Sequence, residues 1–69
     1  MDKLAKIAKM RQMYWKINKH SPTILKLGRD RVNELLMYID YKEEEIYKGA
    51  WVYGMMIEEH ENPKGLEVA

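Results

Sequence analysis

The sequence predicts a small α+β domain in which helices cover one face of a three-stranded, mostly antiparallel sheet. Three patterns predict this class: a helical stripe over residues 2–19, a second stripe after Gly28, and a proline-containing turn between two alternating segments near the C-terminus. The 69 residues form a single domain, 1–69, near the lower size limit for a hydrophobic core that has no disulfide or metal to support it.

The opening segment, residues 2–19, predicts an amphipathic helix. Its apolar residues recur every three or four positions on one side: Leu4, Ile7, Met10, Tyr14 and Ile17. Asp2 near the start and Lys19 near the end match the sign of the helix dipole. The helix is expected to end before Pro22, because the residue that precedes a proline disfavours the helical conformation.

The central stretch predicts a strand, a turn and a helix. Side chains alternate with a period of two over residues 23–27, and Gly28 supplies the turn. The helical stripe that follows consists of Val32, Leu35, Leu36 and Ile39. The alternative is one helix over residues 22–39 with Ser21 as its N-cap, which gives a mainly α helical hairpin followed by the C-terminal β-hairpin.

The C-terminal part predicts a β-hairpin. Residues 54–60 and 65–68 alternate loosely, and the segment between them, Asn62-Pro63-Lys64-Gly65, has the residue types of a type I turn. Because two strands alone are marginally stable, residues 23–27 are expected to provide the third strand. Residues 46–53, whose aromatic residues are interrupted by a glycine, are expected to form an irregular connection.

Charge is distributed unevenly along the chain, although the formal net charge is only +1. Residues 1–20 hold six Lys or Arg against one Asp, whereas residues 43–69 hold seven Glu against two Lys. Such a gradient can steer association or set the register of a head-to-tail assembly. The alternative is that both charged regions are solvated and meet no partner.

The apolar content of 46% is high for a chain with so small an interior, so part of it is expected to meet a partner. The first functional hypothesis is therefore a non-enzymatic protein-interaction module that forms a homo-oligomer or binds and modulates a host protein. Aromatic and Met side chains dominate the centres of protein interfaces. The expected interface anchors are Met10, Met13, Tyr14, Trp15 and Trp51.

The second hypothesis is nucleic-acid binding through the basic opening helix, where cations are interleaved with Tyr14 and Trp15. The expected contacts are Lys6, Lys9, Arg11, Lys16 and Lys19. A related hypothesis concerns the acidic C-terminal segment. Glu58, Glu59 and Glu61 would imitate a nucleic-acid backbone and occupy the DNA groove of a host protein.

The residues of a catalytic or cofactor site are not found in the sequence. The two histidines, His20 and His60, do not stand at a ligating helical spacing, and no Cys is present to hold a metal. Ser21 is the only serine and is better explained as a helix cap, while the four glycines are too dispersed for a phosphate-binding loop. We expect no enzyme activity, no metal and no cofactor.

The composition predicts a cytoplasmic protein. A reducing compartment is the natural setting for a small domain without cysteine. No apolar segment approaches the ~20 residues that span a bilayer, and the lysine-rich start lacks the apolar core of a secretory signal. No membrane partner is expected.

Three motifs occur in order along the chain: Pro22-Thr23-Ile24-Leu25-Lys26-Leu27-Gly28-Arg29-Asp30, then Tyr53-Gly54-Met55-Met56-Ile57-Glu58, then Asn62-Pro63-Lys64-Gly65. Together they resemble small phage- or prophage-encoded proteins of unassigned role, in which a strand ending in Leu-Gly opens a helix and a Gly-led strand precedes a Pro-Gly turn. The resemblance covers about two thirds of the chain, without the opening helix and residues 41–52. It implies an intracellular, phage-borne accessory protein and supplies no activity or catalytic residue.

Overall fold

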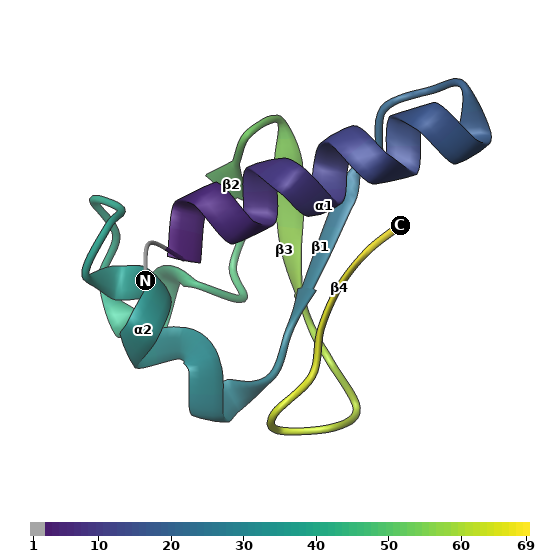
Figure 1. The fold of residues 1–69 in the computed structure, drawn as a ribbon. Helices are drawn as coiled ribbons and strands as arrows, with labels where there is room; N and C mark the ends of the chain where they lie inside the picture. The colour runs from purple at the N-terminus through teal and green to yellow at the C-terminus, as the bar shows by residue number, and fades with distance from the viewer. Residues whose placement is uncertain (1–2) are drawn as a thin grey trace.

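A four-stranded sheet and two α-helices make up the fold, with the helices on one face of the sheet (Figure 1). The computed structural model describes residues 3–69, so Asp2, which the sequence pattern assigns to the opening helix, lies outside the described residues. The elements in chain order are α1 (Lys3–Asn18), β1 (Ile24–Leu27), the 3-10 helix η1 (Arg29–Arg31), α2 (Val32–Leu36), the 3-10 helix η2 (Glu43–Glu45), β2 (Trp51–Val52), β3 (Met55–Glu59) and β4 (Leu66–Val68). The predicted α+β class is confirmed, but the sheet has four strands rather than three.

β1 lies inside the sheet, between β3 and β4. The strand order is β2-β3-β1-β4, and β1 pairs in parallel with β3 and antiparallel with β4. Leu25 and Leu27 are buried, while Ile24 and Lys26 alternate with them and are half-buried. The prediction of a strand over residues 23–27 is therefore confirmed, and the alternative of a single central helix is wrong.

The two C-terminal strands do not form the predicted hairpin, because β1 separates them. β3 and β4 pair with opposite edges of β1, so their connection crosses the end of β1 (Figure 1). That connection contains the predicted turn, in which the Gly65 amide donates to the Asn62 carbonyl oxygen at 2.8 Å. The turn is fastened to the chain beyond β1, since the Asp30 amide donates to the Pro63 carbonyl oxygen at 2.9 Å.

Gly28 lies where this turn crosses β1, and space rather than conformation requires a glycine there. Its backbone is extended, with φ −68° and ψ 148°, which any residue adopts. A Cβ atom at this position would stand 2.2 Å from the Pro63 carbonyl oxygen. The sequence pattern assigns Gly28 to a turn; the structure instead uses it for the close approach of two backbone segments.

The hairpin of this fold joins β2 to β3. Tyr53 and Gly54 form its two-residue loop with φ of 50° and 77°, and positive φ at both central residues is typical of the type I′ turn that suits twisted strands. Val52 lies opposite Met55 beside the loop. The irregular connection predicted for residues 46–53 is thus wrong at its C-terminal end, because Tyr-Gly is not among the sequences that favour this turn.

Both helices are confirmed, and both end earlier than the sequence pattern predicts. α1 ends at Asn18, and Lys19 follows with φ 63°, a left-handed conformation common just after a helix. α2 ends at Leu36, although the apolar stripe continues to Ile39. Residues 37–40 form turns and bends instead, and Ile39 packs against the core from there, so its burial does not require a longer helix.

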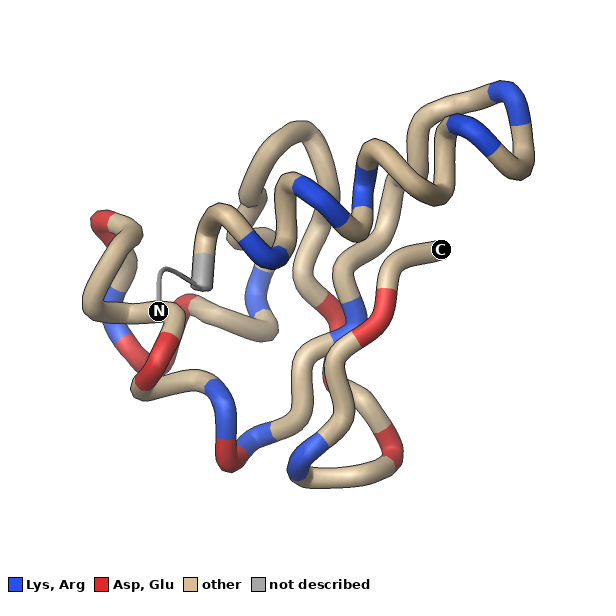
Figure 2. Tube along the Cα trace, in the orientation of Figure 1, with Lys and Arg blue, Asp and Glu red and all other residues tan. Residues whose placement is uncertain are grey.

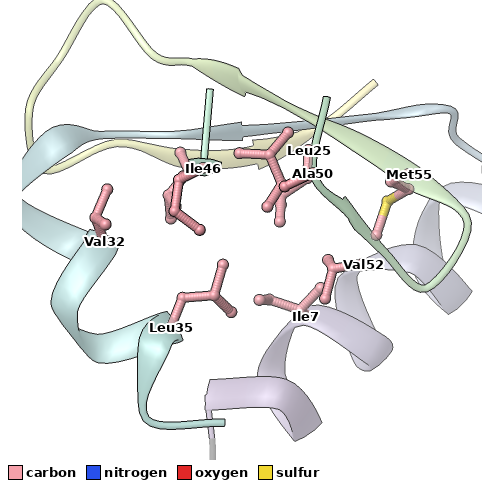
Figure 3. Close-up of a cluster of buried hydrophobic side chains, with 10 residues drawn as sticks. Ile7, Leu25, Val32, Leu35, Ile46, Ala50, Val52 and Met55 are labelled. Atoms are coloured by element: carbon pink, nitrogen blue, oxygen red, sulfur yellow. The ribbon is translucent and has the colours of Figure 1, made fainter. Parts of the chain in front are cut away.

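Ten apolar side chains form the core between the sheet and the helices (Figure 3). They are at most 7% exposed and are Ile7, Leu25, Leu27, Val32, Leu35, Ile46, Ala50, Val52, Met55 and Ile57. No polar or charged side chain is buried among the described residues, so apolar burial provides the driving force of this core. The two largest apolar side chains take no part in it, since Trp15 and Trp51 are 53% and 54% exposed.

Two tyrosines tie the segment between α2 and β2 to the sheet. The Tyr47 hydroxyl donates to the Leu27 carbonyl oxygen at the end of β1. Burial raises the pKa of Tyr47, and the nearby Glu59 carboxylate raises it further. The Tyr41 hydroxyl accepts a hydrogen bond of 3.3 Å from the Trp51 amide, which points away from β3 at the outer edge of β2. Each bond satisfies a backbone group at a strand end or edge.

We expect Gly28→Ala to destabilise the fold by about 3 kcal/mol, because the added Cβ would push the crossing turn away from β1. Chemical denaturation followed by circular dichroism measures the loss. Gly49→Ala is the matched control: its φ of 92° is costly for alanine, by about 1–2 kcal/mol, but no atom lies within 4 Å of the added Cβ. If the two variants lost the same free energy of unfolding, the close approach of the turn to Gly28 would be contradicted.

Tyr47→Phe is expected to lower the free energy of unfolding by about 1 kcal/mol at neutral pH, since the Leu27 carbonyl oxygen loses one of its donors. The pH dependence also changes. Because the folded-state pKa of Tyr47 is raised, its contribution is complete below the unfolded-state pKa of 10.0 and is lost as pH rises through the folded-state pKa. Urea denaturation at about pH 9 to 12 should show a shallower decline in the variant than in the wild type. Parallel declines would be inconsistent with this role.

Candidate interaction surfaces

The helices cover one face of the sheet, and no helix within the described residues covers the other, which we call the open face (Figure 1). Successive side chains of a strand point to opposite faces, so the residues that alternate with the buried ones belong to the open face. They are Trp51 from β2, Met56 and Glu58 from β3, Ile24 and Lys26 from β1, and Glu67 from β4. Strand register arranges these side chains in two rows.

The first row is apolar. Trp51 lies opposite Met56, and Met56 lies opposite Ile24, so three strands contribute one side chain each. Trp51 is 54% exposed, and the other two are half-buried. The open face therefore presents apolar surface to solvent at the end where β1 begins.

The second row is charged. Lys26 lies between Glu58 and Glu67, on the neighbouring strands β3 and β4. His60 Nε2 lies 2.5 Å from Glu67 Oε1, and Glu61 stands nearby in the loop after β3. An open hollow of about 240 Å³ is bounded by Lys26, Glu58, Glu59, His60, Glu61 and Glu67. Carboxylates outnumber cations here, so this end of the open face is acidic.

Glu59 belongs to a separate ion pair. Its register partner is Leu27, so it alternates with Glu58, and its two carboxylate oxygens accept from Arg29 Nε at 2.6 Å and Nη2 at 3.1 Å. These hydrogen bonds, and then the charge of Glu59, raise the pKa of Arg29. The Arg29 guanidinium also lies 5.3 Å from the centre of the Tyr47 ring. Of the three glutamates of the predicted nucleic-acid mimic, Glu59 is thus held by Arg29, although all three bound the same hollow.

α1 carries an exposed stripe on the side turned away from the sheet. Ile7 is 2% exposed and marks the side that faces the core. Residues about 80° to 180° around the helix axis from Ile7, on one side of it, form the outer stripe, in which Ile17 and Lys6 lie at the edge nearest the core. The outer stripe is Lys6, Lys9, Met13, Lys16 and Ile17. Met13 is 54% exposed and Ile17 75% exposed, so two large apolar side chains stand in water among three lysines.

α1 and the open face differ in the sign of their charge (Figure 2). The described side chains of α1 include four cations and no acid: Lys6, Lys9, Arg11 and Lys16. Lys19 adds a fifth cation just beyond the end of the helix. Glu58, Glu61 and Glu67 gather at the open face. The molecule therefore presents a cationic helix on one side of the sheet and an acidic region on the other.

The five predicted interface anchors do not form one patch. Met13 and Trp15 are both exposed on α1, but residues two apart in a helix point to nearly opposite sides. Met10 and Tyr14 are half-buried, and the ring of Tyr14 contacts that of His20 edge-on. Trp51 lies on the open face, the other side of the sheet from α1. The anchors therefore belong to three surfaces.

The five predicted nucleic-acid contacts are all exposed. Three of them, Lys6, Lys9 and Lys16, share the outer stripe of α1, whereas Arg11 lies on the side of Trp15. There a hollow of about 170 Å³ is bounded by Ala8, Arg11, Gln12, Trp15 and Ser21. The structure therefore divides the predicted cations between two sides of α1.

Sequence reasoning missed part of both surfaces. The helical pattern assigns Ile17 to the buried side, and this is wrong because the C-terminal half of α1 projects past the sheet (Figure 1). Ile24, Met56 and Glu67 alternate with apolar neighbours, and this period of two was a signal that they share an outward direction. Their placement on the same face as Trp51 depends on strand register, which no local pattern reveals.

Within residues 3–69, no group of three or more His, Asp or Glu side chains is arranged to hold a metal ion. The helices of this range include none with the length and apolar content to cross a membrane. No protein-family model, curated protein or solved structure matches the chain. What it binds is therefore inferred from the chemistry of the open face and of the outer stripe.

Proposed function

We propose that this protein is a non-enzymatic protein-interaction module that associates with further copies of itself. The observation that supports this most directly is the exposure of large apolar side chains, seven of which are 41–79% exposed in the described chain. They are Met13, Trp15, Ile17, Met37, Tyr38, Trp51 and Tyr53. Transfer of such surface from water into an interface is favourable. In a phage-encoded accessory protein of the host cytoplasm, this surface would serve assembly or the capture of a host protein.

A second copy is the partner that the charge distribution favours. The outer stripe of α1 carries three lysines, and the charged row with its excess of glutamates lies on the opposite side of the sheet. Every copy therefore holds both members of a complementary pair of surfaces. Complementary charge speeds encounter and disfavours incorrect orientations.

The hollows of the surface suit contact better than catalysis. The hollow beside Trp15 and the hollow at the charged row are bounded mainly by exposed side chains. Acid-base and nucleophilic catalysis depend on enclosed sites that exclude water and fix the reacting groups. We therefore assign these surfaces to binding.

The double substitution Met13→Ser and Ile17→Ser is expected to weaken self-association about tenfold, because it removes the apolar part of the outer stripe. Sedimentation velocity over a concentration series measures the change. The wild type should exceed the mass of a single chain, 8.3 kDa, as its concentration rises. Thermal unfolding of the dilute variant should match that of the wild type, since both side chains are exposed.

Met37→Ser is the matched control for this experiment. Met37 is 79% exposed, but it follows α2 and belongs neither to the outer stripe nor to the open face. Its substitution should leave the mass distribution unchanged. A wild-type chain that stays at 8.3 kDa at every soluble concentration would refute the proposal.

A second candidate function is nucleic-acid binding through α1. The observation that favours it is the absence of acids among the described side chains of α1. The glutamates of the charged row lie on the other side of the sheet. Lysines along one helix side can follow a phosphate backbone, and Trp15 beside Arg11 offers a ring for base stacking. The sheet would lie between these glutamates and a nucleic acid bound to α1, so their repulsion of its phosphates would act only at a distance.

Binding of this kind must weaken steeply with salt, because neutralised phosphates release their counterions. Lys9→Gln with Lys16→Gln is expected to reduce the slope of log affinity against log salt by about 2, measured by fluorescence anisotropy with single-stranded and duplex DNA and RNA. Lys48→Gln, an exposed lysine outside α1, is the control and should leave the slope unchanged. Absent or salt-insensitive binding would eliminate this candidate.

A further inference from the structure

We infer that α1 of one copy docks on the open face of the next, with the outer stripe in the place that a third layer would occupy. This rests on the proposed self-association and specifies its geometry. The occupant of the open face is a second copy of this chain, and the two surfaces that meet are different parts of the molecule.

One end of the open face, where β1 begins, has the apolar composition of a face that another element covers. Antiparallel sheets that expose one face to water usually carry polar side chains there, whereas sheets covered on both faces carry apolar side chains on both. Trp51, Met56 and Ile24 form a continuous apolar row on the open face. A covering helix would remove this row from water.

The spacing of the outer stripe matches the spacing of the two rows. The apolar row and the charged row are two residues apart along β1 and β3, or about 6.6 Å. Met13 and Lys9 are four residues apart on α1, or about 6 Å along its axis. A helix that lies along the strands therefore sets Met13 on the apolar row while Lys9 meets the charged row, and Ile17 follows about 6 Å beyond the apolar row.

Charge complementarity selects a second copy as the source of this helix. The charged end of the open face has three glutamates, Glu58, Glu61 and Glu67, around one lysine. The outer stripe has three lysines and no acid. The two symmetric arrangements pair opposite charges less well. Paired outer stripes set Lys against Lys, and paired open faces set either Glu against Glu or the charged row against the apolar row. Helix on sheet is the arrangement that pairs opposite charges.

Such a contact is heterologous, because each copy uses α1 toward one neighbour and its open face toward the other. Contacts of this kind continue into rings or filaments. The mass of the assembly should therefore grow in steps of one chain, 8.3 kDa. Added salt should shorten the assemblies, because exposed charges are screened.

Two charge-reversed variants test the geometry. The helix-reversed variant carries Lys6→Glu and Lys9→Glu, the two lysines on the charged side of Met13, and the sheet-reversed variant carries Glu58→Lys and Glu61→Lys. All four side chains are exposed, so both variants should fold, which thermal unfolding checks. Each variant alone should show a dissociation constant raised about tenfold or more, because like charges meet at the contact. A 1:1 mixture should recover association, because the reversed helix then meets the reversed face.

The matched control carries Glu43→Lys and Glu44→Lys in η2. It changes the net charge as much as the sheet-reversed variant does, at exposed glutamates that belong to neither surface. Its mass distribution should equal that of the wild type. Equal weakening of the control and of the sheet-reversed variant would assign the effect to net charge and overturn the docking geometry.

The remaining outcomes separate this inference from the proposed function. If the wild type associates and the sheet-reversed variant associates equally well, self-association stands and docking on the open face is wrong. A mixture of the two reversed variants that stays dissociated also overturns the docking. A wild-type chain that remains a monomer overturns both.

Tryptophan quenching gives an independent measure of the same contact. Trp15→Phe leaves Trp51 as the emitter, and Trp51→Phe leaves Trp15, since the chain has two tryptophans. Trp51 lies in the apolar row and should become shielded from acrylamide as protein concentration rises. Trp15 lies off the outer stripe and should remain accessible at the same concentrations. Shielding of Trp15 with Trp51 left accessible would overturn the docking geometry.

Discussion

The position of β1 between β3 and β4 is the constraint on which the rest of the structure depends. Because β1 pairs with both strands, the chain must cross it to pass from β3 to β4, and the crossing is possible because Gly28 has no side chain. The same pairings fix the register of the strands. Register then decides which side chains meet the helices and which form the open face. The composition of both surfaces thus follows from the placement of one strand.

The elements that local physics controls could be predicted from the sequence. Alternation predicted the strand over residues 23–27, and Asn62-Pro63-Lys64-Gly65 predicted the turn that the structure contains. The order of the strands could not be predicted, because alternation tells which way a side chain points and not which strand lies beside it. The β2-β3 hairpin was missed because Tyr53 adopts a positive φ, which costs a non-glycine residue about 1–2 kcal/mol and depends on the tertiary fold for support.

The candidate surfaces were predictable to the extent that they belong to a single element. Met13 and the described lysines of α1, which are Lys6, Lys9 and Lys16, can be located from helical periodicity alone, and they are exposed. Ile17 could not be assigned correctly, because periodicity does not tell where a helix extends beyond the sheet that it covers. Ile24, Trp51 and Met56 come from three strands that are distant in sequence, so their common row exists only after the strands have paired.

The two edges of the sheet differ in their capacity to pair with strands of other chains. An edge strand offers unpaired backbone groups that can template fibre growth. At the β2 edge, the Trp51 amide already donates to the Tyr41 hydroxyl, and a foreign strand would have to displace that bond. β4 forms the opposite edge and pairs with β1 alone. Accidental backbone pairing between two β4 edges would join two molecules, whereas growth into a longer cross-β stack would also have to displace the bond between Trp51 and Tyr41 at each β2 edge.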